Sequence, residues 1–539
     1  MAVIKRILLL MLVVGASTQA HTQVGRYMVF FKEKNGTPYS ISEPQEFLSQ
    51  RAIDRRSKQG IAVTEKDLPV NPAYVESVKS IGVDVFFTTR WMNGLLIQCD
   101  QTLVDDVAAL SFVDRVDFVA PNARLLGNGR KKVPIKQKTS RVANVTSTQL
   151  EQLNIDDMHQ EGLHGEGIVI GIFDAGFGGV DVIDPFAAVI AEGRIDLEAS
   201  KDFIINSDNV FQYDPHGTEV FSVIAAYQSG SFTGGAYKAK YQLYVTEDAA
   251  TEYRIEEYNW LFAAERADSA GVDVVNSSLG YSTFDNNAMD YPKSALDGKT
   301  AVVTRAAQWL ADRGVLIVCS AGNEGNNGWQ LITPPADAID VLSVASVDAK
   351  GARAASSSKG PSADNRIKPD VAALGVGTSV IFPNGSIGAA NGTSLASPLI
   401  ASFAAGVWQK YPDLTNKEIM TLIRQSGSLA HAPNNLLGHG IPDFTKIESY
   451  LISLEKNPFS VFPNPFLDSI TIKPFSPGMV ASCVATLITA EGKKVFETTL
   501  SFTREEPSIT AKLPGLAAGV YMLKLQWKNG SQTMKLAKQ

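Results

Sequence analysis

Four polar residues in the middle of the chain are of the types that acyl-transfer chemistry uses. In chain order they are Asp174, His216, Asn323 and Ser394. A serine hydroxyl becomes a nucleophile when a histidine accepts its proton, and a carboxylate can orient that histidine. An asparagine amide can stabilise the oxyanion that forms. Each residue alone has an ordinary structural explanation, so it is the combination and its order that indicate chemistry.

Two of the four residues follow predicted buried strands. Asp174 ends the apolar run 168–173, and Asn323 follows the apolar run 315–319 after a short Ser-Ala-Gly segment. Continuous apolar runs are typical of parallel strands, which keep functional side chains at their carboxyl ends. A capping aspartate and an ordinary strand-end turn are the structural alternatives.

The other two residues are predicted at helix starts. His216 precedes a glycine that leaves room for close approach, and it opens an apolar helical run through Ala226. Ser394 stands four residues before Pro398. Because proline is tolerated in the first turn of a helix, we place Ser394 at the helix N-terminus, where unpaired N–H groups can stabilise an oxyanion. An N-cap serine and a structural histidine are the alternatives.

Competing motifs fail at single positions. Asp181 stands where a dinucleotide-binding fingerprint starting at Gly176 needs its third glycine. Ala396 stands where the nucleophile elbow of an esterase needs its second glycine. His439 also precedes a glycine, but Pro442 prevents a helix from continuing there.

Composition limits the partners and the class of protein. The 539 residues are 45% hydrophobic and 19% charged, which excludes a disordered or collagen-like chain. The net charge of −7 makes nucleic acid an unsuitable partner. The cysteines Cys99, Cys319 and Cys483 stand singly, which argues against a disulfide framework and against a zinc site.

The first 20 residues have the pattern of a signal peptide. Lys5 and Arg6 precede the apolar run 7–14, and small residues lead to a predicted cleavage after Ala20. Eight apolar residues are too few for a membrane helix, which needs about twenty. No later stretch is long and apolar enough to span, so we expect a secreted or cell-surface protein without a transmembrane segment in the mature chain.

Three regions with different sequence patterns, here called regimes, follow the signal peptide. Residues 24–125 predict a small α+β domain, with strands at 27–31, 83–88, 95–98 and 113–119 and helices at 43–56, 72–81 and 103–110. Residues 126–144 are basic and polar and predict an exposed linker open to cleavage. Residues 145–450 predict a doubly wound, mostly parallel α/β sheet, and residues 457–539 predict a small β-sandwich.

The middle regime resembles the subtilisin-like serine proteases, or subtilases, over about residues 150–445. The chain order Asp, His, Ser is the order of that family. The matching segments are Asp174-Ala175-Gly176, His216-Gly217-Thr218, Ser320-Ala321-Gly322-Asn323 and Gly392-Thr393-Ser394-Leu395-Ala396-Ser397-Pro398. Two further segments, Lys359-Gly360-Pro361 and 366–371, resemble the family's usual approach to the serine, and 276–280 resembles its substrate-pairing edge strand.

The resemblance implies a secreted endopeptidase that works through an acyl-enzyme. Ser394 would be the nucleophile, His216 the general base, and Asp174 the residue that orients the imidazole. Asn323 and the Ser394 N–H would form the oxyanion hole. The residues flanking a protein or peptide substrate would be Ser278, Leu279, Gly280, Ala321 and Gly322.

The resemblance also sets the expected cofactors and leaves one alternative. It implies no cofactor for catalysis; structural calcium is common in the family, but no loop of this sequence identifies a calcium site. Glu219 stands where the family usually has a second histidine, and Ser397 where it usually has alanine. Glu219 lies one helical turn beyond His216 and could raise its pKa. A catalytically silent surface-binding protein with the subtilase fold is the alternative function.

The two regimes that flank the catalytic one resemble domains that accompany it in the same family. Residues 24–125 resemble a pro-domain that inhibits the enzyme until the linker is cut. Residues 457–539, with Val461-Phe462-Pro463-Asn464-Pro465-Phe466 near their start and Gly519-Val520-Tyr521 before a short basic ending, resemble a type IX secretion sorting domain. The implied partners are the chain's own pro-domain and the secretion machinery; an unrelated carbohydrate- or protein-binding sandwich is the alternative for the last domain.

Overall fold

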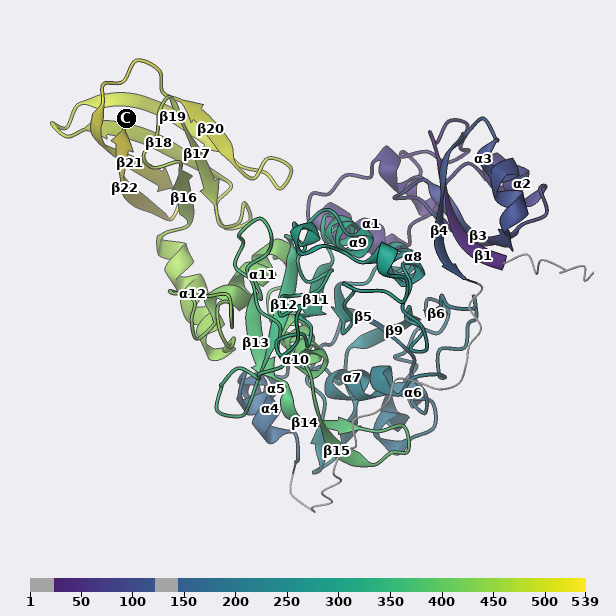
Figure 1. The fold of residues 1–539 in the computed structure, drawn as a ribbon. Helices are drawn as coiled ribbons and strands as arrows, with labels where there is room; N and C mark the ends of the chain where they lie inside the picture. The colour runs from purple at the N-terminus through teal and green to yellow at the C-terminus, as the bar shows by residue number, and fades with distance from the viewer. Residues whose placement is uncertain (1–23, 122–143) are drawn as a thin grey trace, which may run out of the picture.

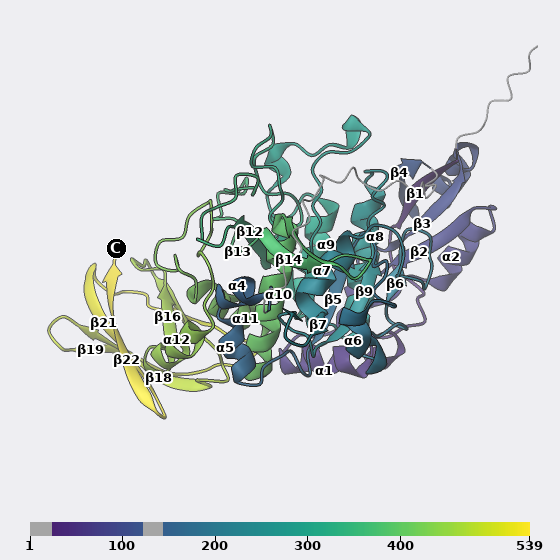
Figure 2. The same ribbon diagram turned by 90° about the horizontal axis from the view of Figure 1, so that it is seen from below.

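The computed structural model describes residues 24–121 and 144–539 in three domains. The N-terminal and C-terminal domains lie on opposite sides of a larger central domain (Figures 1 and 2). The predicted signal peptide, 1–20, and the predicted linker with its maturation site, 126–144, lie outside the described residues except for Asn144. No described helix is long and apolar enough to cross a membrane.

The N-terminal domain is an antiparallel sheet with helices, in the strand order β2-β3-β1-β4. Its elements are β1 (Val24–Phe31), α1 (Gln50–Lys58), α2 (Pro72–Lys79), β2 (Asp84–Thr89), β3 (Gly94–Asp100), α3 (Val104–Ala108) and β4 (Val113–Pro121). The predicted strands and the predicted helices at 72–81 and 103–110 are confirmed within a few residues. The helix expected at 43–56 was wrong at its start, because Pro44 opens a separate short turn and the Ser49 hydroxyl caps α1 by accepting the Ala52 N–H at 3.2 Å.

The central domain is built on seven parallel strands in the order β13-β12-β11-β10-β5-β9-β6. The strands are β5 (Val169–Asp174), β6 (Lys201–Asp202), β9 (Lys240–Val245), β10 (Val274–Ser277), β11 (Leu316–Ser320), β12 (Val341–Val347) and β13 (Val371–Leu374). Every residue of β5, β10, β11, β12 and β13 is buried, as the continuous apolar runs predict.

Helices cover both faces of this sheet. Alternate residues of β5 face opposite cores: Ile170 and Ile172 pack with α7 (His216–Ala225) and α10 (Thr393–Lys410), whereas Val169 and Phe173 pack with α8 (Ile255–Ala270) and α9 (Val302–Ala311). The remaining elements are α4 (Ser147–Glu151), α5 (Ile155–Gln160), α6 (Ala187–Ala191), β7 (Tyr227–Gln228), β8 (Phe232–Thr233), β14 (Val376–Ile381), β15 (Ile387–Asn391), α11 (Asn416–Gln425) and α12 (Thr445–Lys456). The predicted doubly wound parallel sheet is confirmed.

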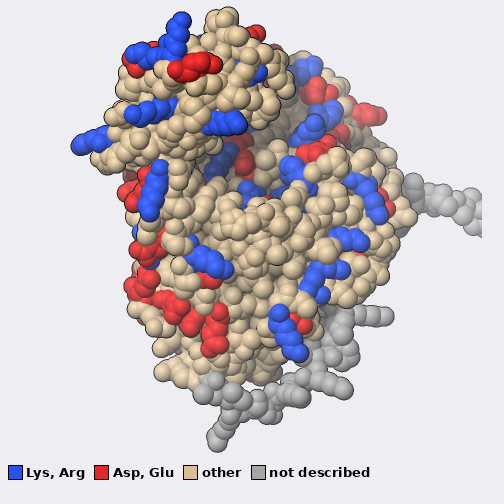
Figure 3. Space-filling model, turned by 90° about the vertical axis from the view of Figure 1, so that its left-hand side faces the viewer, with Lys and Arg blue, Asp and Glu red and all other residues tan. Residues whose placement is uncertain are grey.

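The C-terminal domain consists of two antiparallel sheets around one apolar core, so the predicted β-sandwich is confirmed. One sheet contains β16 (Phe459–Phe462), β17 (Ser469–Pro474) and β20 (Ile509–Lys512). The other contains β18 (Ser482–Thr489), β19 (Lys494–Ser501), β21 (Gly519–Trp527) and β22 (Gly530–Lys538). Helix α12 leads into this domain (Figure 1). A cavity of about 440 Å³ lies where the domain meets α11, and Figure 3 shows this face hollowed below the C-terminal domain.

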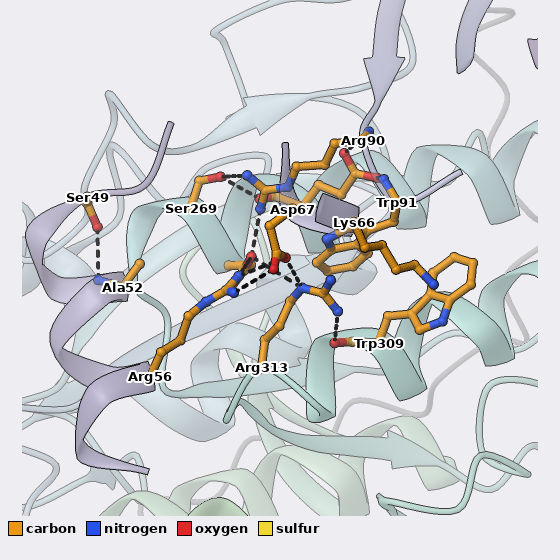
Figure 4. Close-up of polar contacts among 12 residues, drawn as sticks. Ser49, Ala52, Arg56, Lys66, Asp67, Arg90, Trp91, Ser269, Trp309 and Arg313 are labelled. Carbon is orange, nitrogen blue, oxygen red and sulfur yellow. Dashed lines mark hydrogen bonds and ion pairs between the residues drawn. The ribbon is translucent and has the colours of Figure 1, made fainter. Parts of the chain in front are cut away.

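A buried ion cluster joins the N-terminal domain to the central domain. Helix α1 lies against the central domain, away from the sheet of its own domain (Figure 1). Three arginines of the N-terminal domain, Arg55, Arg56 and Arg90, each donate a hydrogen bond of 2.6 Å to the carboxylate of Asp268 at the end of α8. A further pair has its charges the other way round: Arg313 of the central domain donates a hydrogen bond of 2.6 Å to Asp67 of the N-terminal domain (Figure 4).

Candidate active site

Asp174 and His216 meet at the carboxyl edge of the central sheet. Asp174 is the last residue of β5 and is fully buried, and His216 is the first residue of α7. The Asp174 Oδ1 lies 2.7 Å from His216 Nδ1. Gly217 permits this approach, because a Cβ at that position would lie 2.2 Å from the Gly176 carbonyl oxygen and 3.0 Å from the Asp174 Cβ. The strand end and the helix start thus place the two side chains as their sequence positions predict.

Carboxylates near the imidazole change its affinity for protons. Burial lowers the pKa of His216, but the charge and hydrogen bond of Asp174, with smaller contributions from Glu247 and Glu219, outweigh burial and raise the pKa to about 9. The expectation that Glu219 favours the charged imidazole therefore agrees in direction with its position in the structure. A histidine of this kind acts as a base only when the pH is high enough to leave it neutral.

Asn323 and Ser394 lie on either side of Gly392. A Cβ added at Gly392 would lie 2.8 Å from the Ser394 Oγ and 3.7 Å from the Asn323 Nδ2. The Asn323 Oδ1 accepts the Thr393 N–H at 3.0 Å, and this contact fixes which end of the amide faces the serine. The Nδ2 donor and the Ser394 hydroxyl are therefore neighbours, as an oxyanion hole beside a nucleophile requires.

Ser394 is the second residue of α10, which confirms the predicted helix N-terminus, but the reasoning from Pro398 was wrong. Pro398 lies in the interior of α10, beyond its first turn. A proline there cannot donate to the carbonyl four residues earlier, which is the carbonyl of Ser394. The Ser278 hydroxyl donates to that carbonyl at 2.8 Å instead. The proline thus leaves an acceptor through which a second segment holds the serine in place.

A chain of side-chain hydrogen bonds extends from this contact. The Asn276 Nδ2 donates to the Ser278 Oγ at 3.1 Å, and the Ser397 Oγ donates to the Asn276 Oδ1 at 2.7 Å. The sequence marked Ser397 only as a departure from the family pattern. Its partner could not be found from local sequence, because Asn276 lies on β10, more than a hundred residues earlier.

The predicted substrate-flanking residues border a cavity of about 330 Å³. Ser278, Leu279, Gly280 and Gly322 line it together with Asn323, whereas Ala321 is fully buried and does not. The edge-strand interpretation of 276–280 was wrong for its first two residues, because β10 is a central strand between β11 and β5. Residues 278–280 continue beyond the end of β10, whereas β5 and β11 each extend one residue past the partner of Ser277.

The cavity has further lining residues, of which only Ser320 was quoted among the sequence motifs, as part of the Asn323 motif. They are polar or acidic: Glu247, Glu252, Ser282, Thr283, Asp285, Ser320, Glu324 and Thr333, with Phe284 as the apolar exception. Glu324 directly follows the quoted Asn323 motif and could have been noticed there. Nothing in the local sequence distinguishes Thr333.

The rival histidine, His439, and a further histidine, His159, have other partners. The His439 Nδ1 lies 3.1 Å from the Asp370 carbonyl oxygen, and the His159 Nε2 lies 2.9 Å from the Gly235 carbonyl oxygen. Both are structural contacts to backbone. Among residues 24–121 and 144–539, no three His, Cys, Asp or Glu side chains gather closely enough to hold a metal ion.

Comparison with known families matches all three domains. Residues 165–440 match the subtilase family, residues 26–139 match the peptidase S8 propeptide domain of Bacteroidota, and residues 460–539 match the secretion system C-terminal sorting domain. The order of these matches is the order of the three domains in the structure.

Individual relatives agree with the central match. Subtilisin from Bacillus pumilus is 28% identical over 275 residues, which cover 50% of this chain and 87% of that protein. Subtilisin E from Bacillus subtilis is 28% identical over the same length, which covers 63% of that protein. The epidermin leader peptide processing serine protease of Staphylococcus aureus is similar in fold, with a TM-score of 0.54 at 16% identity over 79% of this chain and 98% of that one.

Proposed function

Because the chain belongs to the subtilase family and is a serine protease with a propeptide domain and a sorting domain, we propose that it is an exported endopeptidase that cleaves proteins through an acyl-enzyme. The observation that carries this proposal is that the four residues form two pairs, one at the start of α7 and one at the start of α10, and these two helices pack in the same apolar core. Asp174 contacts His216, and Asn323 and Ser394 meet at Gly392, all at one edge of one sheet.

The chemistry assigns a role to each residue. The Ser394 Oγ attacks the scissile carbonyl while the His216 Nε2 accepts its proton. The imidazolium then gives this proton to the leaving amine, and water hydrolyses the acyl-enzyme by the same route. Asp174 holds the Nδ1–H of the imidazole and stabilises its charged form without taking the proton. The developing oxyanion is stabilised by the Asn323 Nδ2 and the Ser394 N–H.

The flanking domains have roles before and after catalysis. The N-terminal domain is the chain's own inhibitor, held on the central domain by the buried cluster around Asp268. Maturation is a cut in the linker. The C-terminal domain carries the exported protein to the secretion machinery, which releases it to the medium or retains it at the cell surface.

A fluorophosphonate probe tests the catalytic proposal. This reagent phosphonylates a serine only where a base activates it, so the purified wild-type protein should be labelled at Ser394 and the Ser394→Ala variant should not. A wild-type protein that is folded, has its linker cut and stays unlabelled would instead indicate the catalytically silent protein with the same fold.

A further inference from the structure

The cavity beside the active site is strongly acidic. Of its fourteen lining residues, four are carboxylates, Glu247, Glu252, Asp285 and Glu324, and none is lysine or arginine. Glu247 is only 5% exposed. Two further carboxylates of α8, Glu256 and Glu257, act with Glu247 and Glu252 on the buried Tyr281: burial raises the pKa of that hydroxyl and these charges raise it further. Four carboxylates therefore line the space in which a substrate side chain would lie.

The cavity is continuous with the catalytic residues. Asn323, which lies beside the Ser394 hydroxyl, is one of its lining residues, and Glu324 follows Asn323 directly. Farther along the lining, the Asp285 N–H donates to the Glu252 carbonyl at 2.8 Å, and the Glu252 N–H donates to the Asp285 carboxylate at 3.1 Å. Glu247 lies close enough to His216 to raise its pKa. A side chain of a peptide held at Ser394 would thus enter a cavity that carboxylates line.

A buried hydroxyl between two glycines adds an acceptor to the cavity. Thr333 is 4% exposed, and its Oγ1 has no hydrogen-bond partner within the described residues. A Cβ at Gly280 would lie 2.1 Å from this oxygen, and one at Gly322 would lie 2.9 Å from it. A threonine hydroxyl can accept a hydrogen bond as well as donate one, and the side chains of lysine and arginine are donors only.

A metal ion does not explain this arrangement. In the described part of the chain, no group of three acidic, histidine or cysteine side chains is close enough to coordinate one. The carboxylates surround a space of about 330 Å³ and do not converge on one point. Such a space suits an extended cationic side chain, whose methylene stem can lie along Leu279 and Phe284.

The chain itself contains a segment of the complementary charge. Residues 122–143 include seven lysines and arginines and no aspartate or glutamate: Arg124, Arg130, Lys131, Lys132, Lys136, Lys138 and Arg141. The described N-terminal domain ends at Pro121, directly before this segment. Val119 and Ala120, at the end of β4, belong to the same buried cluster as Leu279 and Tyr281.

We propose that this cavity selects substrates with lysine or arginine at or near the residue preceding the scissile bond, and that segment 122–143 is its first substrate. This inference rests on the proposed endopeptidase activity and names its substrate class. Carboxylates in a partly desolvated cleft attract a cation, whereas a neutral side chain gains no such electrostatic attraction.

Paired peptides measure the selectivity directly. Two fluorogenic peptides that differ only in arginine against citrulline before the scissile bond have nearly the same shape and different charge. With the full-length precursor after maturation, kcat/KM should be at least about tenfold higher for arginine in low salt, and the ratio should fall as salt is raised. Equal values for the two peptides would overturn the inference while leaving the endopeptidase proposal intact.

Charge-neutral variants locate the selectivity. Glu247→Gln and Glu324→Gln should each lower the arginine-to-citrulline ratio at least about threefold, whereas Glu151→Gln, which removes one exposed charge on α4, should leave it unchanged. Because each ratio compares two substrates on one enzyme, an effect of Glu247 on His216 cancels. If the arginine-to-citrulline ratio falls equally in all three variants, the preference comes from the net charge of the protein. That result would contradict the claim that the cavity is its source.

A binding measurement separates failure of the inference from failure of the proposed function. In the Ser394→Ala variant with its linker cut at an engineered protease site and the N-terminal domain removed by dilution, fluorescence anisotropy should show tighter binding of the arginine peptide. A wild-type protein that is unlabelled by fluorophosphonate but keeps this preference would refute only the endopeptidase activity. Equal affinities for both peptides would refute the basic selectivity.

Discussion

The ion cluster around Asp268 predicts how firmly the N-terminal domain is held after the linker is cut. Asp268 has a fully buried side chain, and the side chains of Arg55, Arg56 and Arg90 are 4%, 1% and 8% exposed. Burial would raise the pKa of Asp268, but the surrounding arginines outweigh it and hold that pKa below its ordinary value. The carboxylate is therefore charged at neutral pH and pairs with three arginines of the other domain, of which Arg56 also pairs with Asp67 at 3.1 Å.

Asp268→Asn removes the charge and keeps the shape of the side chain. Removing one partner of a buried ion pair costs about 3–5 kcal/mol, because the remaining charges stay buried without compensation. At 1.4 kcal/mol per tenfold change, the affinity of the N-terminal domain for the central domain should fall by about 10²- to 10⁴-fold. The contribution of Asp268 is complete above its ordinary pKa of 3.8 and is lost only as the pH falls below that value, so raising the pH should not release the domain.

The assay uses the Ser394→Ala background with a specific protease site placed within 122–143. After that site is cut, the dissociation constant of the two fragments follows from size-exclusion chromatography over a range of concentrations. Lys58→Ala is the matched control on the same helix, because Lys58 and Asp413 form an exposed ion pair at 3.6 Å. Such a pair contributes about 1 kcal/mol or less, so the control should change affinity by about fivefold at most. If Asp268→Asn changes the affinity no more than Lys58→Ala does, the cluster does not hold the domains together.

Three further predictions concern the catalytic domain. Because carboxylates raise the pKa of His216 to about 9, kcat/KM should rise with pH toward that value. Glu219→Gln should move this rise to lower pH. Superimposable pH profiles of the two enzymes would show that Glu219 does not act on the histidine. Ser397→Ala leaves the buried Asn276 Oδ1 without its donor and should destabilise the fold by about 1–3 kcal/mol in urea unfolding, with an unchanged free energy of unfolding as the contrary result. A chain that ends at Lys456 keeps all four proposed catalytic residues and should retain kcat/KM on a small peptide within about threefold. The same chain should accumulate in the periplasm of its host. Lost activity would contradict the first expectation, and release equal to that of the full chain would contradict the second.

The elements that carry the proposed catalytic residues could be predicted because their signals are local. The apolar run before Asp174 and the helical run after His216 each fix one end of an element. Parallel strands bring their carboxyl ends to one edge whatever else surrounds them. The sequence therefore predicted the correct edge of the sheet for Asp174 and Asn323, and the correct helix ends for His216 and Ser394.

The contacts that hold these residues in place could not be predicted, because they join distant segments. Pro398 was interpreted from local helix rules alone, which place a proline in the first turn. Its actual position in the interior of α10 depends on the Ser278 hydroxyl, which takes over the contact to the Ser394 carbonyl. Likewise, Ser49, whose hydroxyl caps α1, donates its own N–H to the Ser269 carbonyl at 2.9 Å, and Ser269 lies more than two hundred residues later.

The acidic cavity shows another limit of prediction from the sequence. Its carboxylates come from segments around 247–252, 285 and 324, none of which is an acidic run. The basic linker was visible in the sequence as an exposed segment, but its complement appears only when the chain is folded. Charge complementarity between two such segments is a property of the fold and has no local signal.

The most direct test of the account is the kinetics of the catalytic residues as a unit. If Ser394 attacks only when His216 accepts its proton, Ser394→Ala, His216→Ala and the double variant should lower kcat on one peptide by similar factors, with the double variant no worse than either single one. The account predicts this non-additive result for proteins that are equally folded by circular dichroism. Peptide hydrolysis that survives Ser394→Ala, or losses that multiply in the double variant, would contradict it.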